Sequence, residues 1–144
     1  MNRVSTAVSA LLIALAFVSG CGGAKPPESH SADEPEAIAR TEFTDRIENF
    51  FEYEPLRVAK PSQVRIHLTN LADGSPVERA EVSLTVRRPG TSDTVVQTTA
   101  RIGKVTGIYV AELSVPQAGN YDIEFHVKNS KLDERLPLTG FQVE

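Results

Sequence analysis

Apolar and polar residues alternate along most of the chain after residue 43, the pattern of strands that each bury one face. The clearest case is residues 61–86, where two alternating runs flank a cluster of turn-forming residues at 71–76. We expect these two runs to form the nucleus of a sheet, with the rest of the domain covering its apolar face.

The same alternation recurs in short runs separated by Gly, Pro, Asn and Asp. The predicted strands cover residues 46–53, 61–69, 81–87, 94–101, 107–113, 121–128 and 132–143. About seven short strands without a helix predict an all-β fold, an Ig-like antiparallel β-sandwich. Pro137 confines the last strand to a sheet edge or a bulge. In such folds a tyrosine placed after a turn, here Tyr121, often ties the corner with its hydroxyl group.

The N-terminus has the features of an export signal. Residues 7–18 are continuously apolar and follow Arg3, but they are fewer than the ~20 residues that span a bilayer as a helix. The next residues, Val18-Ser19-Gly20-Cys21, resemble the lipobox of bacterial lipoprotein precursors. We therefore divide the chain into a lipoprotein signal peptide (1–20), a lipidated N-terminus with a flexible tether (21–42) and a folded domain (43–144).

Cys21 is the only cysteine, and it stands where lipid attachment needs a thiol. A single cysteine excludes an intramolecular disulfide and a site with several thiolate ligands. Acyl chains contribute ~0.8 kcal/mol per buried methylene, so a multiply acylated N-terminus would stay on a membrane. We expect the protein to lie outside the cytoplasm, anchored to a bacterial membrane and facing the periplasm. The sequence does not indicate whether this is the inner or the outer membrane. The alternative is an ordinary secretory signal that happens to end at Cys21.

Residues 22–39 contain three prolines, several acids and almost no large apolar side chain. Such a segment buries too little surface to offset its ordering entropy, which predicts a tether. A short helix at residues 34–40 is the alternative.

Charge and motifs exclude several function classes. The formal net charge is −4 and no basic patch stands out, which argues against a nucleic-acid partner. The chain has no nucleophile elbow, zinc-protease motif, P-loop or dinucleotide fingerprint. We therefore expect no enzyme activity, no catalytic residue and no cofactor.

Two histidines, His67 and His126, fall on the polar phase of their strands. If they shared one outer sheet face, Glu124 could complete a metal site. Solvated strand positions are the more common explanation, so no metal site is predicted.

A binding module remains, because the ends of a sandwich carry loops and its edges accept strands. The candidate binding loops are residues 71–77, 88–93 and 115–121, although the first of these also reads as an ordinary turn. The aromatic residues Phe50, Phe51 and Tyr53 could form a contact strip, but core packing explains them better.

The folded part also resembles a known family. The residues that carry this resemblance are FFEYEPLRV at 50–58, PSQV at 61–64, HLT at 67–69, Leu71, PV at 76–77, GIY at 107–109, Pro116, AG at 118–119 and Tyr121. They resemble the N-terminal β-sandwich domain of periplasmic adaptor (membrane fusion) proteins in heavy-metal RND efflux systems.

The resemblance implies an accessory or recognition module with an efflux or other envelope protein as partner. An adaptor continues into further domains, whereas this chain stops at Glu144, so we expect no bridging role. Copper-handling members of that family use methionine ligands, and the only methionine of this chain is Met1. The resemblance therefore does not lead us to expect metal transfer by this chain. The alternatives are a periplasmic metal- or solute-binding lipoprotein and a purely structural envelope lipoprotein.

Overall fold

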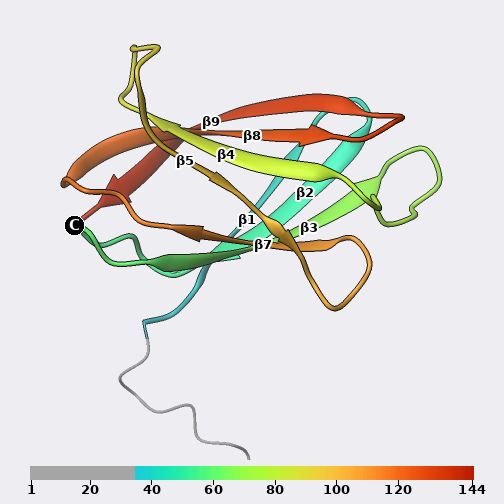
Figure 1. Cartoon of the computed structure of the whole chain (residues 1–144), viewed down its shortest axis with the longest axis horizontal. Helices are drawn as coiled ribbons and strands as arrows, with labels where there is room; N and C mark the ends of the chain where they lie inside the picture. The colour runs from blue at the N-terminus through green and yellow to red at the C-terminus, as the bar shows by residue number, and fades with distance from the viewer. Residues whose placement is uncertain (1–34) are drawn as a thin grey trace, which may run out of the picture. The chain divides into compact units, whose positions relative to one another are not determined.

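Nine β-strands in two antiparallel sheets make up the computed structural model, which describes residues 35–144 (Figure 1). The strands are β1 (Ile38–Phe43), β2 (Ile47–Tyr53), β3 (Ser62–Asn70), β4 (Glu81–Arg87), β5 (Thr94–Thr99), β6 (Arg101–Ile102), β7 (Ile108–Leu113), β8 (Gly119–Lys128) and β9 (Asp133–Val143). No helix occurs in this part of the chain, and so none there could cross a membrane. The predicted all-β fold is confirmed.

The two sheets enclose one apolar core. The five-stranded sheet has the order β1-β2-β3-β7-β6, and the four-stranded sheet has the order β5-β4-β8-β9. Burial alternates along most strands as the sequence predicts, because one face of each strand points into the core. Aromatic rings from both sheets meet at its centre, where the Phe51 and Phe125 ring centroids lie 4.7 Å apart. This arrangement is consistent with the predicted two-sheet sandwich.

The prediction that residues 61–86 form one sheet nucleus is wrong. Strand β3 belongs to the five-stranded sheet, whereas β4 belongs to the four-stranded sheet. Residues 71–80 therefore carry the chain from one sheet to the other instead of closing a hairpin. Strand β4 lies between β5 and β8, and even its outward residues Ser83 and Thr85 are buried.

The strand count differs from the predicted seven because of β1 and β6. All of strand β1 except Phe43 lies within the predicted tether, and at residues 38–40 the strand replaces the helix that was the alternative there. The folded part thus begins before residue 43. The run 94–101 is divided at Ala100, where the chain leaves β4 and continues as β6 beside β7.

The prediction for Pro137 is confirmed, since β9 is an edge strand. Two residue steps on β8, from Tyr121 to Ile123, face three on β9, from Phe141 to Leu138. This bulge contains Gly140, whose φ of 82° is readily adopted only by glycine.

Candidate functional site

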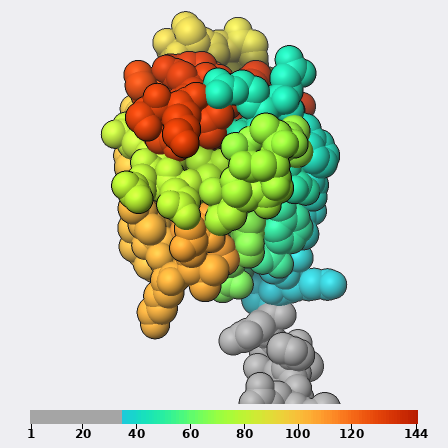
Figure 2. Space-filling view, turned by 90° about the vertical axis from the view of Figure 1, so that its right-hand side faces the viewer, coloured from blue at the N-terminus to red at the C-terminus, as the bar shows by residue number. Residues whose placement is uncertain are grey.

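Three loops at one end of the domain surround an open basin of about 760 Å³. They are the β1–β2 turn, the β3–β4 crossover loop and the β8–β9 turn. Figure 2 looks onto this end and shows the three loops side by side, with the crossover loop in yellow-green. We call this hollow the loop-end basin.

The two turns around the basin are held by their own side chains. In the β1–β2 turn, the Thr44 hydroxyl accepts hydrogen bonds from the backbone N–H groups of Arg46 and Ile47, both at 3.1 Å. In the β8–β9 turn, Asn129 Oδ1 accepts from the N–H groups of Lys131 and Leu132 at 2.8 and 2.9 Å. Such local bonds fix the turn without a partner strand.

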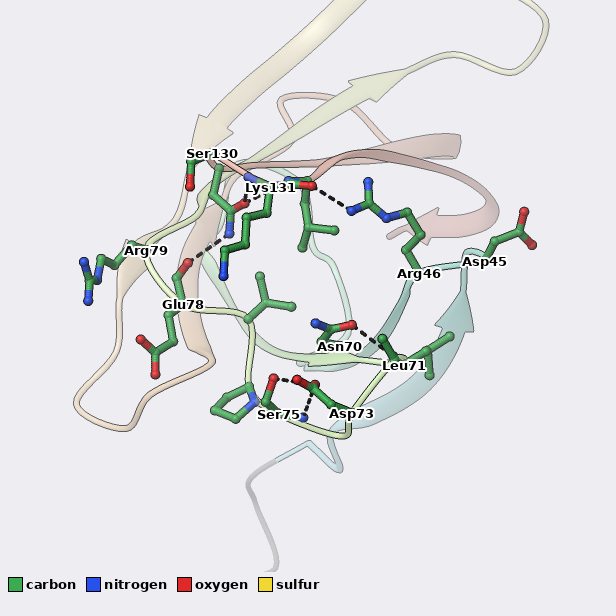
Figure 3. A pocket seen from close by; sticks show the side chains of 15 residues that line it. Asp45, Arg46, Asn70, Leu71, Asp73, Ser75, Glu78, Arg79, Ser130 and Lys131 are labelled. Carbon is green, nitrogen blue, oxygen red and sulfur yellow. Dashed lines mark hydrogen bonds between the residues drawn. The ribbon is translucent and has the colours of Figure 1, made fainter.

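Side chains also join the loops to one another. Asn129 Nδ2 donates to the Glu78 carbonyl oxygen at 3.0 Å, which links the β8–β9 turn to the crossover loop. Arg46 donates to the Lys131 carbonyl oxygen at 2.7 Å, which links the β1–β2 turn to the β8–β9 turn (Figure 3). The rim of the basin is therefore one connected structure.

Tyr109 holds the crossover loop from beneath. Its buried hydroxyl donates to the Val77 carbonyl oxygen at 2.8 Å and accepts from the Ala80 N–H at 3.0 Å. Both backbone groups of the loop are thereby satisfied inside the domain. This contact fixes the position of Val77, which lines the basin.

The Asp73 side chain forms hydrogen bonds within its own loop. Its Oδ1 atom accepts hydrogen bonds from the Ser75 hydroxyl at 2.6 Å and the Ser75 N–H at 3.0 Å (Figure 3). These bonds hold the pKa of the Asp73 carboxyl below its usual range, and the charge of Lys131 lowers it further. Asp73 is thus an ionised turn residue, as its sequence context suggests.

Apolar and charged side chains are both present in the basin. Leu71, Val77 and Leu132 line it, and Leu71 is 45 % exposed. Its charged residues are three acids and three bases, namely Asp45, Asp73, Glu78, Arg46, Arg79 and Lys131. Because the charges balance and most are spread around an open rim, the basin suits a polypeptide surface better than a small ion.

The other two candidate loops, 88–93 and 115–121, come together at the opposite end of the domain. There Arg88 donates to the Gln117 side-chain oxygen and lies 5.9 Å from the centre of the Tyr121 ring. The Tyr121 hydroxyl donates to the Gln117 carbonyl oxygen at 3.0 Å, so Tyr121 ties this corner as predicted. Only residues 71–77 of the three candidate loops line the loop-end basin.

The hypothetical metal site does not form. His67 lies on β3 and His126 on β8, so they face outward from different sheets and cannot share a face. His67 packs edge-on against Phe50, and His126 bonds to Asp133 at 2.6 Å. Glu124 is engaged by Arg135 at 2.8 Å. Within residues 35–144 no group of three or more His, Cys, Asp or Glu could hold a metal ion.

The aromatic residues of β2 divide between the two faces of their strand. Phe51 and Tyr53 are buried, which confirms core packing for these two residues, and Phe50 is half-buried on the outer face beside His67. Burial raises the pKa of the Tyr53 hydroxyl, and the nearby Arg40 partly offsets that rise. The lipidation candidate Cys21 lies outside the described residues.

The sequence analysis did not predict that Arg46, Asn129 and Lys131 belong to one site. The alternating direction of successive antiparallel strands could have shown this. In a chain of such strands, successive connections fall at opposite ends, which places residues 71–80 and 129–132 at the same end.

Comparison with known proteins finds no matching family, no matching characterised protein and no matching solved structure. The resemblance to efflux adaptor domains therefore remains a hypothesis from the sequence.

Proposed function

We propose that this protein is a non-catalytic, lipid-anchored protein of the bacterial cell envelope, and that its folded domain is a recognition module. The anchor is proposed from the sequence, where an apolar segment and small residues precede the single cysteine, Cys21. The loop-end basin is the proposed contact site.

The observation that carries this proposal is the position of the basin relative to the start of the domain. Strand β1 begins at Ile38, which pairs with Tyr53 at the end that also carries the C-terminus (Figure 1). The basin lies at the other end of β1, about 20 Å away at ~3.3 Å per residue. A chain anchored upstream of residue 35 therefore enters the domain at the end away from the basin.

The chemistry of the basin supports binding rather than catalysis. Asp73 Oδ1 and Asn129 Oδ1 accept hydrogen bonds within the turns that contain them. Arg46 is used to join two loops, and it also lies 3.5 Å from Glu134. These polar groups stabilise a fixed shape, which favours contact with a preformed partner surface.

The partner that fits this surface is a protein segment with an apolar side chain and charges of both signs. The exposed Leu71 side chain offers apolar contact, and the exposed Lys131 and Glu78 side chains offer charges of opposite sign. An envelope protein is the proposed class of partner. The adaptor-like sequence features make an RND efflux assembly the first candidate within that class.

We also infer that the domain is Ig-like. Two features support this: the chain passes from the four-stranded to the five-stranded sheet between β5 and β6, and Tyr121 ties a corner through Gln117.

Photo-crosslinking of the full chain in cells tests the proposal. A photoreactive phenylalanine analogue is placed at Leu71 in the basin or at Val58, which is 39 % exposed near the C-terminus. We expect adducts with an envelope protein from position 71 and not from position 58. Absence of adducts at 71, or equal adducts at both positions, would refute the basin as the contact site. Adducts without any RND component would remove the efflux association alone.

A further inference from the structure

Strand β1 is the most regular free edge in the described part of the chain. The edge strand β9 contains Pro137 and a bulge, the pairing of β5 shifts register beside Val86, and β6 has only two residues. Strand β1 runs for six residues without a bulge or a proline. Proline and bulges block strand addition, so β1 is the edge that a further strand could join.

The hydrogen-bond pattern shows which β1 residues face this edge. Thr44 donates its N–H to the Ile47 carbonyl oxygen, so residues 44 and 47 form a hydrogen-bonded pair. Bonded pairs alternate with non-bonded pairs in antiparallel strands, so the backbone groups of Ala39, Thr41 and Phe43 point away from β2. No backbone or side-chain group of residues 35–144 bonds to them outside that ladder.

The side chains of β1 select among possible partner strands. Arg40 and Glu42 lie on the inward face, opposite Phe51 and Asn49, and form an ion pair at 2.6 Å. Inward-facing charges on an edge strand repel most incoming strands, because the added strand would bury them beside apolar side chains. Only a strand with matching charges on the same face is compatible.

A second copy of β1 supplies that match. When two β1 strands run antiparallel with Thr41 opposite Thr41, Arg40 of each copy faces Glu42 of the other on the inner face. On the outer face, Ala39 lies opposite Phe43, which is 62 % exposed. The same register joins the outward backbone groups of Ala39, Thr41 and Phe43 from both strands. Opposite charges placed directly across strands are favourable.

We propose that two copies of this chain associate through antiparallel pairing of their β1 strands, which makes a continuous ten-stranded sheet from the two five-stranded sheets. The two-fold axis passes through Thr41, and the interface is the same patch on both copies. This pairing leaves the loop-end basin of each copy unobstructed by β1 itself. It does not depend on the proposed lipid anchor or on a basin partner.

Charge reversal in full chains tests this pairing. Two full-length copies with different C-terminal tags are co-expressed and solubilised in mild detergent, one tag is captured, and the other is measured. Wild-type copies are expected to co-purify. Arg40→Glu paired with itself, or Glu42→Arg paired with itself, is expected to lower co-capture by about tenfold, because like charges then face each other twice. Arg40→Glu paired with Glu42→Arg is expected to restore it.

Two further variants separate pairing from folding. Thr41→Pro removes an outward N–H and leaves the bonds between β1 and β2 intact, so co-capture should be lost without unfolding. Arg65→Glu reverses a charge on the outer face of β3, away from the free edge, and should co-purify like wild type.

The proposal is overturned if wild-type copies do not co-purify. It is equally overturned if co-capture survives Thr41→Pro and the single charge reversals, which would place self-association on another surface. Failure of the mixed Arg40→Glu and Glu42→Arg pair to recover would refute this register of pairing.

Discussion

Individual residues in this domain carry constraints that alternation along the sequence does not reveal. Gly107 joins the β6–β7 turn to β3, since its carbonyl oxygen accepts the Leu68 N–H at 2.9 Å. Its φ is 81°, and a Cβ added there would lie 2.5 Å from the Pro76 Cβ. Both the backbone conformation and the available space therefore require glycine.

We predict that Gly107→Ala lowers the free energy of unfolding by about 3 kcal/mol or more, since it adds a steric clash to a left-handed backbone. Gly74→Ala is the matched control, because Gly74 has a φ of 71° with nothing within 4 Å of an added Cβ. It should cost only about 1 kcal/mol. Urea unfolding measures both, and equal losses would contradict the role given to Pro76.

A second residue-scale feature is a buried side chain without a hydrogen-bond partner. Asn49 on β2 is 0 % exposed, and neither its amide nitrogen nor its oxygen bonds to any described residue. Burial of an unpaired amide costs free energy that an apolar side chain of similar shape does not.

Replacement of Asn49 by leucine should therefore raise the free energy of unfolding by about 1 kcal/mol. Ser62→Ala is the contrasting change, because Ser62 is buried but its hydroxyl donates to the Glu54 carbonyl oxygen at 3.0 Å. It should lower stability by about 1 kcal/mol. Thermal or urea unfolding compares them, and a destabilised Asn49→Leu variant would show that Asn49 has a polar partner.

The buried Tyr53 makes the stability of the fold depend on pH. Burial raises the pKa of its hydroxyl above the ordinary value of 10.0. At pH values between 10.0 and the higher pKa of the folded state, the Tyr53 hydroxyl is deprotonated in the unfolded chain but still protonated in the folded chain. Stability contributed by Tyr53 is thus present below about pH 10 and is lost as the pH rises further.

The expected result is a steeper loss of stability above pH 10 in the wild-type chain than in Tyr53→Phe. Urea unfolding at a series of pH values measures the difference, and absorbance of tyrosinate gives the titration directly. Parallel pH profiles for the two chains would contradict a raised pKa at Tyr53.

At the scale of elements, the sequence predicted those strands that have one apolar phase. β2, β3, β7 and β8 lie close to their predicted bounds because most of their inward residues are apolar. β1 was missed because two of its inward residues, Arg40 and Glu42, are charged, so its alternation has no continuous apolar phase. The stacking of the Arg40 guanidinium 4.8 Å from the Phe141 ring centre depends on tertiary contacts that no local pattern contains.

The pairing of strands was harder to predict than their existence. Consecutive strands pair roughly two-thirds of the time, which favours a hairpin for β3 and β4. The chain instead crosses between sheets, held by Thr69 beside Pro76 and by Tyr109 beneath Val77. Tyr109 and Val77 lie 32 positions apart in the sequence. Because no local pattern shows such a contact, the sequence predicted the loops around the basin only as separate turns.

We predict that Tyr109→Phe destabilises the crossover loop by about 2–4 kcal/mol, because the buried Ala80 N–H and Val77 carbonyl lose their partner. Tyr121→Phe, which loses one partly buried bond to Gln117, should cost about 1 kcal/mol. Hydrogen exchange should show faster exchange at Ala80 in the first variant only. Unchanged exchange at Ala80 would refute the role of Tyr109.

At the scale of the whole molecule, the described residues form a two-sheet domain whose basin lies at the end away from the start of β1, and the proposed lipid anchor lies upstream of that strand in the sequence. The domain has a connected rim of loops and a free edge strand, and these are the two proposed contact surfaces. Within residues 35–144, Arg46, Asp73 and Asn129 of the basin are engaged in turns and loop contacts. Location at a membrane would then decide which partners these surfaces meet.

Metabolic labelling of the full chain with an alkyne-bearing fatty acid in a bacterial host tests the anchor most directly. We predict a labelled protein whose mature N-terminus, by mass spectrometry, is acylated Cys21, and no label on the Cys21→Ser variant. A mature chain that carries no lipid, or label that persists without the thiol, would contradict the central claim.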